Sequence, residues 1–167
     1  MKKLPVILLL IIVVVQYIKA QPNDSLTNAK LALDYYEKAK KFAEAADDSL
    51  AIVSYSQALN YYKLATDSNA VARVSHNMGI CYYNRNDFFS ALKKHEEALK
   101  LFQAMNNQAG EAQAINSIGV IYLAMSNFPE ALKQFFKSLS IGEAQQNISV
   151  MANAYMNIGL VYDNMRQ

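Results

Sequence analysis

The sequence contains few of the residues from which many functional sites are built. It has a single cysteine, Cys81, which excludes an internal disulfide and any metal site with several cysteines. The only two histidines are His76 and His95, with no cysteine or acidic cluster at metal-ligand spacing around them. Neither a glycine-rich phosphate loop nor a Gly-x-Ser-x-Gly motif occurs. We therefore expect no enzyme activity, no metal and no cofactor.

Linker-like and strongly charged segments are also scarce. The 167 residues include five glycines and three prolines, with no proline-rich or serine-rich run that could join two domains. The net charge of +2 depends on Lys2, Lys3 and Lys19, because without these three the 16 basic residues fall to 13 against 14 acidic ones. A nucleic-acid partner would need a basic stripe, so none is expected. The hydrophobic content of 53% predicts an ordered domain with its own core.

The N-terminal segment has the order of a secretory signal peptide. Two lysines follow Met1, an apolar run covers 4–15, and a more polar stretch closes on Ala20. This order predicts export, with residues 1–20 as the signal and 21–167 as the folded part. The apolar run is short for a membrane span, which needs roughly 20 residues, and an uncleaved anchor is the alternative. We expect the protein in the periplasm or cell envelope.

What the sequence does contain is a short pattern that recurs. A glycine with a tyrosine three positions later occurs at Gly79, Gly119 and Gly159, so the glycines are 40 residues apart. The segments 72–111 and 112–151 are identical at ten positions, most of them small or apolar. A fixed period of this size is typical of stacked helical repeats. The pattern predicts an all-α solenoid of about seven helices. The predicted repeats are 31–70, 71–110 and 111–150, followed by a half repeat at 151–167.

The recurring small residues are interpreted as packing positions. A small residue in the first helix of each pair lets the second helix approach closely, and an alanine of the second helix is expected to meet it. Glycine inside a helix costs about 1 kcal/mol relative to alanine, so three at one register indicate that close contact outweighs this cost. His95 shares its register with Phe135 and Tyr55, and Cys81 shares its register with Ile121. Both are expected to be buried packing residues.

This pattern resembles the tetratricopeptide repeat family over about residues 31–162. The family's order of glycine, tyrosine, alanine and an aromatic residue is found in Gly119, Tyr122, Ala131 and Phe135. The resemblance implies a right-handed superhelix whose concave side is lined by the first helix of each pair and binds peptides. The period matches the 40-residue variety. Exported chains of this kind resemble the N-terminal regions of bacterial membrane-bound histidine kinases and nucleotide cyclases.

The resemblance also implies a binding site on the concave face, near each glycine. Its eight candidate residues are Arg73, His76, Asn77, Gln113, Asn116, Ser117, Asn153 and Asn157. In 40-residue relatives, asparagines near this point bond the backbone of an extended peptide. An amide suits this task because it both donates and accepts hydrogen bonds. The alternative is that these residues are simply solvated polar side chains.

The last predicted helix has no helix after it to cover its apolar surface. Leaving residues such as Ile158 or Leu160 exposed forgoes roughly 1.5–3 kcal/mol each. We therefore expect a fragment of a longer protein, or completion by another subunit, including self-association. The expected function is a protein- or peptide-binding module in the extracytoplasmic part of a bacterial signalling protein. A stand-alone envelope assembly scaffold is the alternative, and the sequence does not identify the partner.

Overall fold

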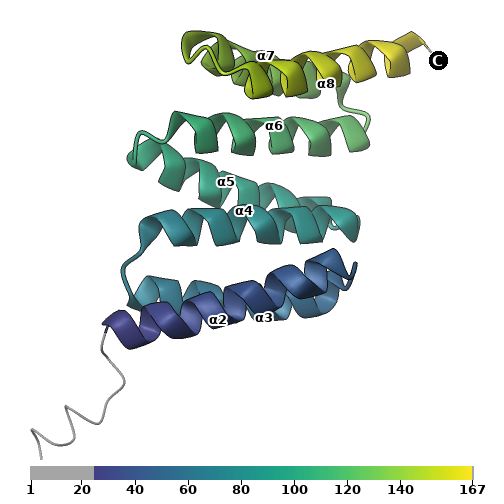
Figure 1. Ribbon diagram of the computed structural model, residues 1–167. Helices are drawn as coiled ribbons and strands as arrows, with labels where there is room; N and C mark the ends of the chain where they lie inside the picture. The colour runs from purple at the N-terminus through teal and green to yellow at the C-terminus, as the bar shows by residue number, and fades with distance from the viewer. Residues whose placement is uncertain (1–24, 167) are drawn as a thin grey trace, which may run out of the picture.

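The computed structural model describes residues 25–166, which form seven consecutive α-helices stacked in pairs (Figure 1). The predicted signal peptide lies outside these residues. The helices are α2 (Ser25–Glu44), α3 (Asp48–Leu64), α4 (Ser68–Asn84), α5 (Phe88–Ala104), α6 (Gln108–Ala124), α7 (Phe128–Ala144) and α8 (Ile148–Arg166). Within the described part of the chain, none of them has the length and apolar character needed to cross a membrane. The structure confirms the predicted all-α solenoid.

One turn geometry joins each helix to the next. A residue with positive φ ends every helix from α2 to α7, and none of these residues is glycine. They are Ala46, Thr66, Asn86, Asn106, Ser126 and Gln146. The backbone N–H of the following residue donates to a carbonyl five positions earlier, as from Asp47 to Phe42 at 2.8 Å. This bond closes the end of the helix in a Schellman arrangement. Because the turn recurs every 20 residues, successive helices run in opposite directions.

The residue after each positive-φ position caps the next helix. The side-chain oxygen of this residue accepts a hydrogen bond from the backbone N–H three positions later, which satisfies one unpaired donor at the helix start. The caps are Asp47, Asp67, Asp87, Asn107, Asn127 and Asn147. Such caps are worth about 1 kcal/mol each, so the local sequence strongly favours these six starts.

Two of the three recurring glycines, Gly79 and Gly119, lie inside helices at points of close contact. A Cβ atom added to Gly79 would lie 2.7 Å from the His95 ring, and one added to Gly119 would lie 2.6 Å from the Phe135 ring. The nearest atoms therefore belong to aromatic rings of the second helix and not to the alanines that the sequence analysis placed there. The reason is geometric, since the flat face of a ring fills the space left by a missing side chain. The interpretation of these two glycines as packing positions is confirmed.

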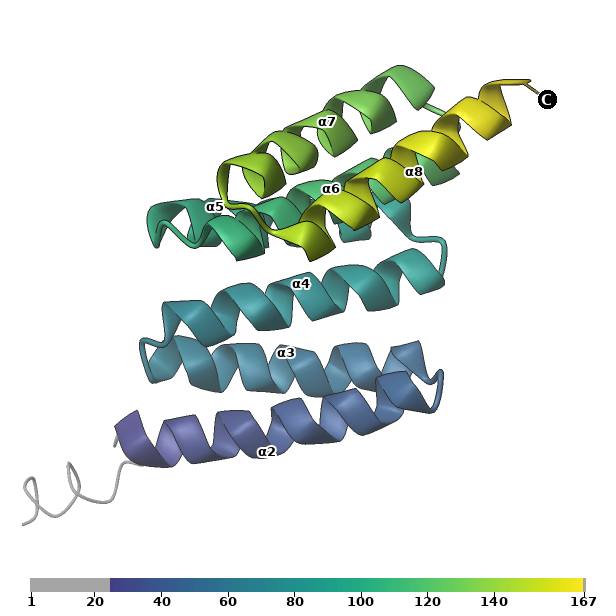
Figure 2. The same ribbon diagram turned by 45° about the horizontal axis from the view of Figure 1, so that its top comes forward.

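The first helices of successive pairs lie on the inner side of the stack. α4 contacts α6, and α6 contacts α8 more extensively, while among the described helices no comparable contact joins α3 to α5 or α5 to α7. Figure 1 shows the first helices α2, α4, α6 and α8 following one another up the stack, and in the turned view of Figure 2 α3 becomes visible between α2 and α4. A stack of this kind has a concave surface on the side where its elements are closest. That surface is formed by the first helices.

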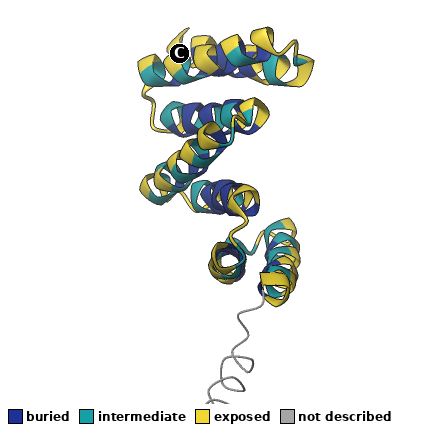
Figure 3. Cartoon of the chain, turned by 90° about the vertical axis from the view of Figure 1, so that its left-hand side faces the viewer, coloured by how far each residue is buried: buried dark blue, intermediate teal, exposed yellow. Residues whose placement is uncertain are grey.

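The last helix, α8, is buried on one face only. Ala154, Asn157, Ile158 and Val161 face the preceding pair and are buried. Tyr155, Tyr162 and the position of Gly159 are exposed, and a Cβ atom added to Gly159 meets nothing within 4 Å. Figure 3 shows exposed residues along the layer that carries the C-terminus. The expected exposed apolar face is confirmed at Leu160, which is 45% exposed, but the expectation for Ile158 is wrong, because this residue faces the preceding pair and is buried.

Candidate functional site

The widest hollow of the concave face crosses the N-terminal halves of three first helices. It has a volume of about 390 Å³ and is lined by polar residues of α4, α6 and α8, among them Arg73, Gln113 and Asn153. These three residues share one register and are all exposed. The lining contains five amides, one hydroxyl and one guanidinium, together with a few apolar residues such as Phe102 and Val150, and no carboxylate. The structure therefore brings three of the eight candidate residues together.

Arg73 is held at one end of this hollow by an aromatic ring. Its guanidinium carbon lies 5.7 Å from the centre of the Tyr36 ring of α2, within range of a cation–π interaction. Asn116 borders a small neighbouring hollow of about 40 Å³ together with Gln113 and Asn153. A row of hydrogen-bonding groups thus runs across the repeats, with a fixed positive charge at its α4 end.

The asparagines nearest the glycines bond between repeats. Asn77 Nδ2 donates to the Tyr36 hydroxyl at 3.2 Å, and Asn157 Nδ2 donates to Asn116 Oδ1 at 2.9 Å. Both pairs are 41 residues apart, so the same bond joins the first repeat to the second and the third to α8. Asn157 is buried and Asn77 is half-buried. These amides stabilise the solenoid, and their bonding to a peptide stays a prediction.

The equivalent position between the second and third repeats carries His76 and Ser117. His76 turns instead toward the second helix of its own pair, where its Nδ1 lies 3.2 Å from Nδ1 of His95. Burial lowers the pKa of His76, and burial together with the neighbouring His76 lowers the pKa of His95 to about 3. Both rings are therefore neutral at pH 7, with one N–H donating to the other ring. His76 is only 8% exposed, so the structure does not place it among the exposed residues of the concave face.

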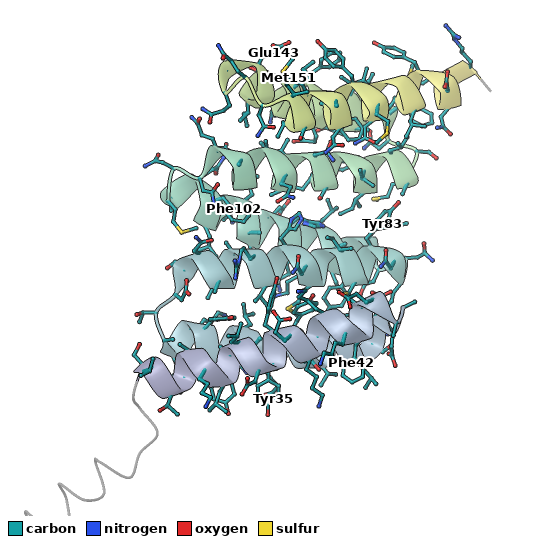
Figure 4. All side chains as sticks on the ribbon, viewed as in Figure 1. Tyr35, Phe42, Tyr83, Phe102, Glu143 and Met151 are labelled. Carbon is teal, nitrogen blue, oxygen red and sulfur yellow. The ribbon has the colours of Figure 1, made fainter. Side chains whose placement is uncertain are left out.

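Two further hollows lie at the C-terminal halves of the first helices, one at each of the first two junctions between repeats. The α2/α4 hollow has a volume of about 260 Å³, and the α4/α6 hollow has one of about 230 Å³. Asn77 lines the former and Ser117 the latter. Tyr83 of the α4/α6 hollow and Phe102 of the widest hollow lie on opposite sides of the stack, toward opposite ends of the helices (Figure 4). The concave face thus has two rows of hollows.

The α2/α4 hollow has a polar, non-reactive floor. Burial raises the pKa of Tyr55, with Cys81 and Tyr36 contributing further. Burial, together with the nearby Asp48, raises the pKa of the Cys81 thiol to about 12. A thiolate is the reactive form of cysteine, so Cys81 is protonated and unreactive at neutral pH, as predicted. No group of three or more metal-ligating side chains occurs within residues 25–166.

Several residues of the concave face were absent from the sequence-based set. Tyr36 occupies the register of His76 and Asn116, and Asn69 and Asn147 also line the widest hollow. Extending the 40-residue register back to the first repeat would have identified Tyr36. Nothing in the sequence pattern marks Ile80 as a shared wall of two hollows, because that depends on how far neighbouring repeats separate.

The repeats have a match among protein families. Residues 70–144 match the family described as Tetratricopeptide repeat. A comparison with curated proteins found no match.

The fold is also similar to solved structures. BtubC (BKLC) from P. vanneervenii has 22% sequence identity and a TM-score of 0.73, over 84% of this chain and 57% of that one. Aspartyl phosphate phosphatase F from Bacillus subtilis has 12% identity and a TM-score of 0.77, over 83% and 36%. The N-terminal domain of stress-induced protein-1 from C. elegans has 15% identity and a TM-score of 0.62, over 78% and 96%.

These similarities define the fold and leave the activity open. All three identities are below 25%, and this chain spans 57% and 36% of the first two structures. Fold alone does not determine function. Residues 70–144 are thus similar to the tetratricopeptide repeat family, and they lie within an all-helical solenoid whose fold the solved structures share.

Proposed function

We propose that this protein is a protein- or peptide-binding module whose site is the concave face. The observation that carries the proposal is the hollow of about 390 Å³ that crosses three successive first helices. Its lining offers donors and acceptors from Gln113 and Asn153, and a positive charge from Arg73. An extended peptide backbone presents alternating carbonyl and N–H groups, which amide side chains can bond in any sequence context. The tetratricopeptide repeat is generally a non-catalytic interaction scaffold, and we propose no enzyme activity here.

Selection from a displayed library of random dodecapeptides tests this proposal. Peptides that bind the protein should lose at least about tenfold in affinity for the triple variant Arg73→Ala, Gln113→Ala, Asn153→Ala, since each lost hydrogen bond is worth about 0.5–1.5 kcal/mol. All three side chains are exposed, so thermal unfolding should change little.

A matched control changes exposed polar residues of the second helices, Gln57→Ala with Lys93→Ala. This control should bind the selected peptides as the wild type does. Equal peptide affinity of the wild type and the triple variant, with both folded, would show that the concave face is not the site.

We further propose that the module works outside the cytoplasm as part of a bacterial signalling protein. The support is the signal-like order of residues 1–20 and the resemblance of exported repeats of this kind to bacterial sensor regions. An alkaline phosphatase reporter fused after the repeats should be active in an export-competent bacterial host. It should become inactive when an arginine replaces Leu9 and another replaces Ile12 in the apolar run. Reporter activity that persists in the variant with both arginines would contradict export by a signal peptide.

A second candidate function is an envelope assembly scaffold that associates through α8. The observation that favours it is the exposed apolar side of α8, where Tyr155 and Tyr162 are 55% and 48% exposed. Light scattering should then show concentration-dependent assembly that Tyr155→Glu with Tyr162→Glu abolishes. A monomer at all concentrations would argue against self-assembly through this helix.

A further inference from the structure

The two junction hollows are copies of one site, one repeat apart. Each residue that lines the α4/α6 hollow has a counterpart 40 positions earlier in the α2/α4 hollow. The polar floor illustrates the correspondence: His95 matches Tyr55, and Ser117 matches Asn77. Ile80 and Asn84 line both hollows and form the wall between them. The concave face therefore presents two adjacent subsites in one orientation.

The two subsites differ in chemistry. The α4/α6 hollow has apolar walls from Ile80, Val120 and Ile121, above the polar floor of Ser117 and His95. Ile80 is 42% exposed, so an apolar side chain entering this hollow would cover surface that now faces water. Burial of such surface favours binding. This hollow fits an aliphatic side chain such as leucine, isoleucine or methionine.

The α2/α4 hollow carries an excess of negative charge. Glu44 and Asp48 line it, and Asp48 Oδ1 accepts a hydrogen bond of 3.2 Å from Asn84 Nδ2. Lys40 also lines it, but its ammonium already contacts the Glu37 carboxylate at 3.4 Å. The two lining carboxylates are thus only partly balanced by Lys40. This hollow fits the ammonium or guanidinium of a basic side chain.

We infer that the protein binds an extended peptide that places an aliphatic side chain in the α4/α6 hollow and a lysine or arginine side chain in the α2/α4 hollow. This inference rests on the proposed peptide-binding function and names its ligand class. Helix α4 separates the two hollows through Ile80 and Asn84. A helix with its side chains is about 10–12 Å across, a distance that polyproline II chain covers in about three to four residues at roughly 3.1 Å each. Side chains three positions apart also point to the same side of a polyproline II helix. The two anchors are therefore three residues apart.

Fluorescence anisotropy with labelled synthetic peptides tests the inference. The probes are proline-rich nonapeptides with leucine and lysine three positions apart, in both orders, and matched peptides with Leu→Ala, with Lys→Glu or with a spacing of two. The parent peptide in the preferred order should bind about tenfold more tightly than the alanine peptide. It should bind about fivefold more tightly than the glutamate peptide.

Protein variants assign each anchor to its subsite. Glu44→Lys, a change of an exposed residue, should remove or reverse the preference for lysine over glutamate in the peptide. The matched control Glu96→Lys makes the same charge change on exposed α5 surface and should leave the preference unchanged. Ser117→Leu should fill the α4/α6 hollow and abolish the preference for leucine over alanine. Circular dichroism confirms that each variant is folded.

The outcomes separate this inference from the broader proposal. Preferences that follow Glu44 and Ser117 support the two subsites. Failure of all nonapeptides to bind overturns the inference, and so do preferences unaffected by Glu44→Lys and Ser117→Leu. If library-selected peptides still depend on Arg73, Gln113 and Asn153 in that case, the peptide-binding function stands with another ligand class. If the library yields no binder, the proposed function fails as well.

Discussion

The helices α6 and α8 carry nearly the same residues along one face and place them in opposite environments. On α6 this face contains Ala112 and Gly119, and on α8 it contains Gly159, the counterpart of Gly119. In both helices a tyrosine follows three positions after the glycine. On α6 the face is covered by α7, with the Phe135 ring against Gly119. On α8 the same face is open among the described residues, and nothing lies within 4 Å of a Cβ atom added at Gly159. The repeat pattern therefore encodes a surface for a partner helix, and the neighbour alone decides whether it is core.

Removing the Phe135 ring, with which α7 covers α6, should produce the largest effect on stability. Phe135 is fully buried, so Phe135→Ala should lower the free energy of unfolding by about 3–5 kcal/mol. The adjacent Phe136 is 49% exposed and provides the matched control, because Phe136→Ala leaves the core intact. Urea unfolding measures both. Equal losses for the two variants would mean that the ring against Gly119 does not hold the third pair together.

Adding a methyl group at the equivalent glycines should give effects of opposite sign. Gly119→Ala forces the Phe135 ring to move and should destabilise the fold by about 1–3 kcal/mol. Gly159→Ala meets open space and should stabilise α8 by about 0.5–1 kcal/mol through helix propensity. Thermal unfolding of both variants decides the point. A loss of stability at Gly159 would indicate that its face is covered in solution.

The second pair should depend on pH in a way that the third pair does not, because His95 stands where α7 has Phe135. The pKa of His95 is about 3 in the folded protein, against about 6.5 in an unfolded chain. The unfolded chain therefore binds more protons between these values, and stability falls as the pH decreases from about 6.5 toward 3. For His95 the slope approaches about 1.4 kcal/mol per pH unit, and His76, whose pKa burial also lowers, acts in the same direction. Urea unfolding between pH 7.5 and 5 measures it.

The control for this pH effect copies the third repeat into the second. The double variant His76→Asn with His95→Phe carries the residues found at Asn116 and Phe135. It should show a flatter dependence of stability on pH over the same range. An unchanged slope would assign the effect to groups other than the histidine pair.

The smallest predicted effect concerns the turn that leads into α8. Gln146 has φ of 52°, a left-handed conformation that costs a non-glycine residue about 1–2 kcal/mol. Gln146→Gly should therefore raise stability by about 1 kcal/mol or less and increase hydrogen-exchange protection of α8. Gln145 has φ of −91°, and Gln145→Gly is the control that should not stabilise. If both variants gain stability, the left-handed conformation of Gln146 is not the cause, because glycine then stabilises the turn at either position.

The turns show what sequence reasoning could and could not predict. The caps are visible in the sequence because aspartate and asparagine satisfy helix N–H groups locally. The left-handed residues were not visible, because positions such as Ala46 and Thr66 lack the glycine that usually marks this conformation. Their conformation is held by the hydrogen bonds of the turn, while Gly79 and Gly119 serve packing inside the helices.

The concave face also contains features that the sequence could predict and features that it could not. The register of Arg73, Gln113 and Asn153 predicted one row of exposed polar groups, and the structure places these residues along one hollow. The same register predicted His76 on this surface, but the ring turns inward because His95 offers a buried hydrogen-bond partner. A register fixes which side of a helix a residue occupies, whereas its neighbours decide where the side chain points.

The sequence by itself determined the helices, their caps and the recurrence of a small residue in the first helix of each pair. These depend on local spacing and on chemistry that each repeat contains. The tertiary structure alone decided which glycines are covered, which polar groups bond between repeats, and where the hollows open. The physical reason is the curvature of the stack, which sets the separation of the first helices at each junction. α6 and α8 lie close, while α2, α4 and α6 leave room for two side chains.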